Sequence, residues 1–158
     1  MMLDMAKYFS ENPMKYSIAF IAFGGEEAGL VGSKHYVYNP TASFPLSKTK
    51  FVFNMDLMGS GEAGATIVNS TVYPDYFKRL EQINDEKGYL TRLKKRGKAA
   101  NSDHYFFSEN GVPSFFIYLM GDYKHYHVPS DNAQNLKLDS NYNNAFKLIR
   151  DFIIELNK

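Results

Sequence analysis

The sequence has no cysteine, and its positive and negative charges almost cancel. The absence of cysteine excludes disulfides, thiolate metal sites and thiol catalysis. A formal net charge of +1 at pH 7 argues against a nucleic-acid partner, because phosphate groups call for a basic face. The basic run at 92–98, "RLKKRGK", lacks interleaved aromatic residues and is typical of a solvated strand end or loop.

Long hydrophobic runs are missing as well. The apolar stretches at 16–23 and 114–120, "YSIAFIAF" and "SFFIYLM", are too short to span a bilayer. The opening residues "MMLDMAKYF" carry charges where a signal peptide needs an uninterrupted apolar segment. We therefore expect no membrane span, and the sequence shows no signal that would identify a compartment.

The composition is typical of one globular domain with a substantial core. The chain has 158 residues, of which 44% are hydrophobic and 22% are charged. No repeat, linker or low-complexity segment divides it, so residues 1–158 are predicted to form a single domain.

Periodicity and turn residues predict the local structure. Apolar residues at helical spacing, with Pro and Gly at the ends, predict helices over 2–10, 26–40, 73–88, 102–111 and 138–156. Ser102 is the expected N-cap of the fourth of these, and Gly111 follows its end. Apolar runs predict buried strands over 16–23, 48–59 and 112–120, with a short strand at 64–69. Strands that alternate with helices imply an α/β fold around a largely parallel or mixed sheet.

Acidic and imidazole side chains follow the predicted strands. Glu26 and Glu27 come after the first strand, Asp56 ends the second, and His127 lies in the loop after the last. Taken singly, a Glu pair is typical of a solvated surface, an Asp of a turn, and a His of a structural hydrogen bond. Together they occupy equivalent places at the strand ends, where sites gather in α/β folds.

These residue types are the ligands that zinc and related divalent ions prefer. A dication at the strand ends would explain the adjacent carboxylates, because it would hold one as a ligand and leave the other to act as a general base. His125 competes with His127 for the imidazole position, since residues two apart on an extended segment face the same way.

Three segments resemble the zinc aminopeptidases of peptidase family M28. "FIAFGGEEAGLVGSKHYV" is similar to the family's Glu-Glu signature, and "FVFNMDLMGSG" to its Asn-x-Asp segment. "SDHYFFSENGVPSFFIYLMGDYKHYHVPSDNAQNLKLDS" resembles its Ser-Asp-His, Gly-x-Pro and Tyr-His-x-x-x-Asp segments, in the same order. The resemblance covers nearly the whole chain. It implies a three-layer αβα sandwich of the zinc-exopeptidase type, with a mixed, largely parallel central sheet.

The resemblance also implies roles for five residues. Glu26 would be the general base that takes a proton from metal-bound water. Glu27 and His127 would bind one zinc ion, and Asp56 the other. Tyr126 would donate a hydrogen bond to the developing oxyanion, although a packing aromatic is an equally good interpretation of this residue.

The resemblance also implies structural roles for residues near these five. The pattern His-x-Pro-x-Asp selects His127 over His125 and makes Asp131 a residue that orients the loop. Asp103 and His104 are expected to be structural rather than zinc ligands, and His35 to be an exposed helical residue.

Two ligands of the family's binuclear site, a first His and a bridging Asp, lie upstream of the segment that resembles residues 1–13. No His precedes His35, and Asp4 falls inside the first predicted helix. The sequence is therefore expected to be a C-terminal part of the catalytic domain, with at most weak binding of zinc. Apolar surface left uncovered should favour self-association.

The leading hypothesis is a zinc-dependent aminopeptidase that removes N-terminal residues from peptides, with this chain a weakly active or inactive part of it. A glutaminyl-cyclase-like acyltransferase with one zinc ion is an alternative from the same fold. A non-catalytic domain on the peptidase scaffold is another. Members of the family are commonly exported, which would place the protein outside the cytoplasm.

Overall fold

The computed structural model describes residues 1–136 and 138–158. Its centre is a four-stranded sheet with the order β1-β4-β2-β3, formed by β1 (Val52–Met55), β2 (Ala65–Val68), β3 (Leu93–Lys95) and β4 (Ser114–Leu119). β1 runs parallel to β4 and β2 runs parallel to β3, whereas β2 and β4 are antiparallel. The sheet is thus mixed and mostly parallel, as the sequence predicts.

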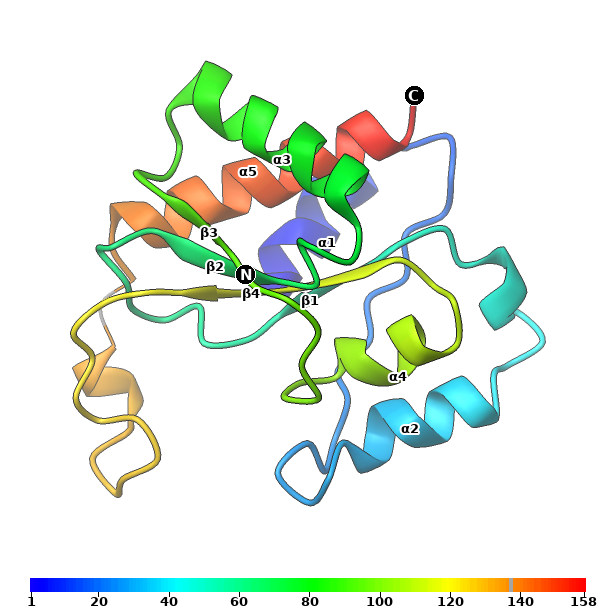
Figure 1. Ribbon diagram of the computed structural model, residues 1–158, viewed down its shortest axis with the longest axis horizontal. Coiled ribbons are helices and arrows are strands. Elements are labelled where there is room, and N and C mark those ends of the chain that lie inside the picture. The colour runs from blue at the N-terminus through cyan, green and yellow to red at the C-terminus, as the bar shows by residue number, and fades with distance from the viewer. Residues whose placement is uncertain (137) are drawn as a thin grey trace.

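Helices cover both faces of the sheet (Figure 1). One face carries α1 (Met2–Glu11), α3 (Pro74–Lys87) and α5 (Ser140–Leu156), and the other carries α2 (Val31–Tyr38) and α4 (His104–Glu109). Two short 3-10 turns, Leu46–Lys48 and Ala133–Asn135, complete the described elements. No described helix is long and apolar enough to cross a membrane.

Local signals account for most helix ends. α3 begins with Pro74, whose missing N–H costs nothing in the first turn, and it ends at Gly88 with a φ of 62°. Asp139 is the N-cap of α5, and its carboxylate accepts hydrogen bonds from the backbone N–H groups of Asn141 and Tyr142. Helices 2–10, 73–88 and 138–156 are therefore confirmed within one or two residues at most ends.

The main hydrophobic core lies between the sheet and the three helices α1, α3 and α5. Phe115 of β4 and Phe152 of α5 are both fully buried, and Phe51 packs its ring 5.1 Å and 5.4 Å from theirs. A smaller cluster of Val37, Phe107 and Val112 fills the opposite face. Aromatic pairs of this kind add packing energy beyond the area they bury.

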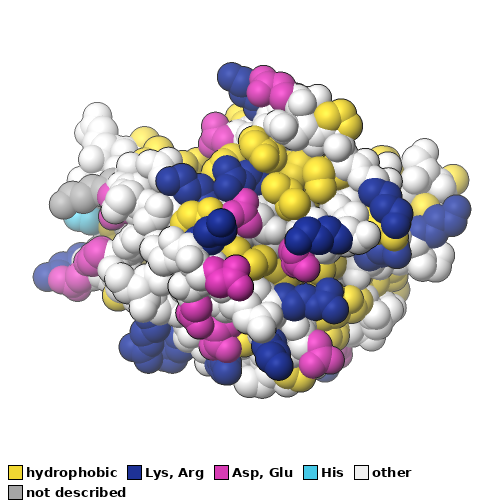
Figure 2. Space-filling model, turned by 90° about the horizontal axis from the view of Figure 1, so that it is seen from above, with side chains coloured by type: hydrophobic (Ala, Val, Ile, Leu, Met, Phe, Trp, Pro, Cys, Tyr) yellow, Lys and Arg dark blue, Asp and Glu magenta, His cyan; other side chains and the backbone are white. Residues whose placement is uncertain are grey.

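The surface over the three-helix face mixes charges of both signs, with hydrophobic side chains visible between them (Figure 2). β3 forms an edge of the sheet, and Lys94 and Lys95 on it are exposed. Exposed lysines keep an edge strand from pairing with another chain. The basic run at 92–98 is thus a solvated edge strand and the loop after it.

The strand predicted at 16–23 is wrong in this structure. These residues form no strand, and Phe20 and Ile21 are 36% and 38% exposed. Phe23 packs against Tyr36 and Phe107, on the side of the sheet where β1 is the edge. An apolar run becomes a strand only when a neighbouring strand accepts its hydrogen bonds, and among the described residues no strand pairs with it.

Two further predictions need correction. β1 is half-buried rather than buried, because an edge strand has a neighbour on one side only. The helix predicted over 26–40 starts at Val31, and the preceding turn includes Gly25 and Gly29 with φ values of 69° and 100°. Positive φ is incompatible with a right-handed helix, so Glu26 and Glu27 lie in a turn instead.

Candidate active site

The turn that carries the two glutamates is folded tightly against the start of α2. The backbone N–H of Leu30 donates to the carbonyl of Glu26 at 2.8 Å, and that of Val31 donates to Gly25 at 3.0 Å. Gly32 approaches Gly24 so closely that a Cβ at position 32 would lie 2.5 Å from the Gly24 oxygen. The glycines of "GGEEAGLVG" therefore allow the close approach that holds both carboxylates at the mouth of a cavity.

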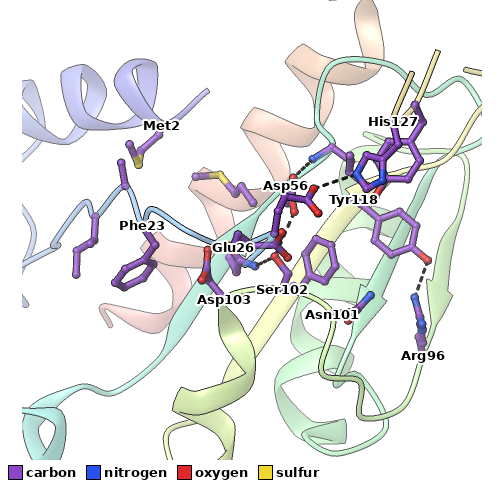
Figure 3. A pocket seen from close by; sticks show the side chains of 18 residues that line it. Met2, Phe23, Glu26, Asp56, Arg96, Asn101, Ser102, Asp103, Tyr118 and His127 are labelled. Atoms are coloured by element: carbon purple, nitrogen blue, oxygen red, sulfur yellow. Dashed lines mark hydrogen bonds and ion pairs between the residues drawn. The ribbon is translucent and has the colours of Figure 1, made fainter. Parts of the chain in front are cut away.

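This cavity, of about 800 Å³, lies at the carboxyl end of β1 and beside the loop after β4 (Figure 3). All five residues singled out in the sequence line it, namely Glu26, Glu27, Asp56, Tyr126 and His127. They come from three separate segments of the chain, which the sheet brings together. Figure 3 shows Glu26 and Asp56 near the middle of the group, with His127 beyond Asp56.

Glu27 and His127 form the one direct pair among the predicted metal ligands. Nε2 of His127 lies 3.0 Å from Oε1 of Glu27, and both side chains are more than half exposed. An exposed pair of this kind contributes only about 0–1 kcal/mol to stability. His127 also has a φ of 58°, which is strained for a residue other than glycine. Strain retained for so little stability is typical of a functional position.

Asp56 is held by both of its oxygens. Oδ1 accepts a hydrogen bond from the N–H of Leu57 at 2.8 Å, and Oδ2 accepts one from the hydroxyl of Ser102 at 3.2 Å. That hydroxyl in turn accepts a bond from the amide of Asn54 at 2.7 Å. The N-cap prediction for Ser102 is therefore wrong, because α4 begins after Asp103 and the buried Ser102 hydroxyl connects β1 to the loop before α4.

Sequence reasoning missed the role of Asn54 and Ser102. A signal was present, since Asn54 precedes Asp56 by two residues and the side chains of alternate strand residues share a face. Nothing local identifies Ser102 as their partner, because it lies 46 residues away from Asp56 along the chain.

The surroundings of Glu26 shift the pKa of its carboxyl group. Burial raises the pKa of Glu26, and the negative charges of Glu27, Asp56 and Asp103 raise it further. A carboxylate with a raised pKa is a better proton acceptor at neutral pH than an ordinary surface glutamate.

Tyr126 is placed beside the imidazole. Its ring stacks on that of His127 with centroids 3.9 Å apart. Burial raises the pKa of the Tyr126 phenol, and the charges of Asp56 and Glu27 add to the effect. The hydroxyl therefore stays protonated at neutral pH and can donate a hydrogen bond.

His125 and Asp131 support the same loop. Nδ1 of His125 lies 2.8 Å from the hydroxyl of Ser130, away from the Glu27 pair. Asp131 accepts a hydrogen bond from the Tyr123 hydroxyl at 2.6 Å, which raises the pKa of Tyr123 to about 12. Both residues thus make contacts within the loop that carries His127.

His104 is fully buried, and its ring packs 5.5 Å from that of Phe116. Burial lowers the pKa of His104 to about 4, so the ring is neutral under ordinary conditions. Asp103 lines the cavity, and its buried Oδ1 atom has no hydrogen-bond partner among the residues that the structure describes. His35 is exposed on α2, as expected.

The residues of the cavity do not by themselves complete a catalytic zinc site. Within residues 1–136 and 138–158, no three His, Asp or Glu side chains converge as ligands of one ion. Glu27 and His127 supply two donors, whereas catalytic zinc sites ordinarily have three protein ligands and a water molecule.

Comparison with known proteins shows the family and the fold of this chain. Residues 1–153 match the profile of Peptidase family M28. The chain belongs to the M28 peptidase family. It is 31% identical over 149 residues to aminopeptidase YwaD of Bacillus subtilis, covering 85% of this chain and 31% of that protein. The structure of BSAP, a zinc aminopeptidase from Bacillus subtilis, superposes with a TM-score of 0.84 and 27% identity, over 99% of this chain and 40% of BSAP.

This chain covers less than half the length of aminopeptidase YwaD and of BSAP. A glutaminyl cyclase from an Acidobacteriales bacterium also superposes, with a TM-score of 0.73 and 19% identity, over 99% of this chain and 59% of the cyclase. At that identity the likeness shows the shared fold alone.

Proposed function

We propose that this M28 chain carries the general base, an oxyanion donor and three zinc-binding side chains of an aminopeptidase that acts on the N-terminal residues of peptides. The observation that carries the proposal is the Glu27–His127 pair beside Glu26 in one cavity. In a metallopeptidase, zinc supplies Lewis-acid activation of water or of the carbonyl.

The chain's own residues would perform the proton transfers. Glu26, with its raised pKa, accepts a proton from the attacking water and delivers it to the leaving amine. The protonated hydroxyl of Tyr126 donates to the oxyanion that forms on the scissile carbonyl. Asp56 faces the same cavity in a fixed orientation and is the candidate donor to a second ion.

Activity of this chain should be weak. With two donors, Glu27 and His127, an ion is held loosely, and misplacement of a reacting group by about 1 Å costs on the order of a hundredfold in rate. We therefore expect slow hydrolysis at best.

The experiment compares the chain with Glu26→Gln in the presence of zinc, measuring release of leucine from Leu-anilide. The matched control is Glu11→Gln, which removes an exposed carboxylate outside the cavity. Slow release that Glu26→Gln abolishes and Glu11→Gln retains supports the proposal. A rate unchanged by Glu26→Gln contradicts it.

The same assay includes a Gln-peptide. Cyclisation of that peptide faster than release of leucine would favour the cyclase-like alternative. If zinc-loaded chain processes neither substrate, the non-catalytic interpretation holds for this chain.

A further inference from the structure

One cation faces the acidic cavity. Four carboxylates line the cavity, from Glu26, Glu27, Asp56 and Asp103, and Arg96 is the one Lys or Arg side chain among its described lining residues. Figure 3 shows Arg96 beyond Asn101, on the side away from Met2 and Phe23. The cavity is therefore polarised, with negative charge around Asp56 and a single positive charge near Tyr118.

Arg96 is not engaged by the cavity's acids. In the part of the chain that the structure describes, its guanidinium forms no ion pair with a carboxylate. Lys95 and Lys98, which flank it in sequence, pair instead with Glu81 and Glu109. The N–H groups of Arg96 that do not contact protein are consequently free to donate to a ligand.

Hydrogen bonds fix both the backbone and the side chain of Arg96. Its backbone N–H donates to the buried Ser70 hydroxyl at 2.9 Å, and that hydroxyl lies 3.1 Å from the Arg96 carbonyl. At the other end, Nη1 donates to the hydroxyl of Tyr118 on β4 at 3.3 Å. Arg96 is exposed, and this hydrogen bond restricts its guanidinium, which therefore loses less conformational entropy on binding than an exposed arginine without a side-chain partner.

Tyr118 adds a second donor. Because its oxygen accepts from Arg96, its own O–H proton is available to a ligand that lies beside the Arg96 guanidinium. The Tyr118 ring packs 5.3 Å from that of Phe116, and both rings line the cavity. A guanidinium and a phenol hydroxyl on one aromatic wall form a binding surface for a carboxylate.

We propose that Arg96, with Tyr118, binds a carboxylate of the peptide, so that this cavity prefers short or acidic peptides with an anionic group beyond the N-terminal residue. The substrate class rests on the proposed peptidase function. The acidic groups around Asp56 attract the peptide's ammonium group and repel its carboxylate, which directs the carboxylate toward Arg96. The carboxylate can be the C-terminus of a dipeptide or an Asp side chain in the second position.

Binding to the metal-free chain tests this assignment independently of catalysis. NMR titrations would use four ligands: Leu-Ala, Leu-Ala-amide, Leu-Asp-amide and Leu-Asn-amide. Tighter binding of Leu-Ala than of its amide identifies a terminal carboxylate, and tighter binding of the Asp peptide than of the Asn peptide identifies a side chain. We expect a preference of about tenfold for at least one carboxylate, the size of a charge-assisted hydrogen bond.

Variants assign the preference to Arg96. Arg96→Gln should remove it, and Tyr118→Phe should reduce it while retaining the aromatic wall. Lys95→Gln is the matched control, since it removes an adjacent positive charge that does not line the cavity, and it should leave the preference intact.

Absence of any carboxylate preference, or a preference that survives Arg96→Gln, overturns the assignment. A carboxylate preference that Arg96→Gln removes confirms the binding assignment even if the zinc-loaded chain releases no leucine from Leu-anilide. Absence of leucine release would refute the proposed peptidase function but not the assignment of Arg96.

Discussion

Nε2 of His127 lies 3.0 Å from Oε1 of Glu27, which joins the turn before α2 to the loop after β4. Neither side chain is buried, so the contact adds little to stability, yet His127 has a strained positive φ. The predictions below test what this pair and its surroundings do.

The first prediction concerns zinc. The chain should bind at most one zinc ion weakly, because Glu27 and His127 are the two potential donors that converge among residues 1–136 and 138–158. Glu27→Gln or His127→Gln should lower the affinity by about tenfold or more, since each removes one of two ligands. His125→Gln, whose imidazole contacts Ser130, should leave it unchanged. Calorimetric titration measures all four proteins, and tight binding of two ions would show a more complete site.

The second prediction is a loss of stability in acid caused by His104. Its pKa is about 4 in the folded chain and near 6.5 when unfolded, so the unfolded state binds more protons between these values. Stability from the neutral ring is complete above the unfolded pKa and falls as pH drops toward 4. The loss should be about 2 kcal/mol at pH 5 relative to pH 7.5.

Urea unfolding at both pH values measures this effect. His104→Phe should flatten the pH dependence by that amount, whereas His35→Gln should not, because His35 is exposed on α2. Equal pH dependence in the chain and in His104→Phe would refute the assignment to His104.

The third prediction addresses the link between Asn54, Ser102 and Asp56. Ser102→Ala should lower the free energy of unfolding by about 1–2 kcal/mol, because the half-buried amide of Asn54 loses its acceptor and Asp56 loses a donor. Ser10→Ala removes an exposed hydroxyl that donates to the Lys7 carbonyl, and it should change stability by less than about 0.5 kcal/mol. Denaturant titration compares the two, and equal effects would mean that the link is not stabilising.

The fourth prediction concerns the apolar segment 16–23. We propose that its exposed side chains Phe20 and Ile21 promote association between copies of the chain at high concentration. The double substitution Phe20→Ser with Ile21→Ser should weaken association, whereas Val72→Ser, at another exposed apolar position, should not. Sedimentation measures the distribution of species. A monomer at every concentration tested would argue against this surface.

Some features of this protein were determined by sequence alone because their causes are local. The apolar period of α3 and α5, together with Pro74, Gly88 and Asp139, sets where those helices begin and end. The glycines on either side of Glu26 have positive φ values, which require a turn. The helix predicted over 26–40 therefore starts too early, since α2 begins at Val31. The order of strands and helices was sufficient for the fold class, since connection rules leave few α/β arrangements.

Other features depended on contacts between distant segments. The run at 16–23 has the composition of a strand, but pairing requires a neighbouring backbone, and none of the described strands provides one. Ser102 has the sequence context of an N-cap, but its hydroxyl bonds to Asp56, which only the packing of the α4 loop on β1 brings near. The orientation of Arg96 toward the cavity likewise follows from Tyr118 on β4. Side-chain hydrogen bonds extend only about 3 Å, so their partners are decided by which segments the sheet places side by side.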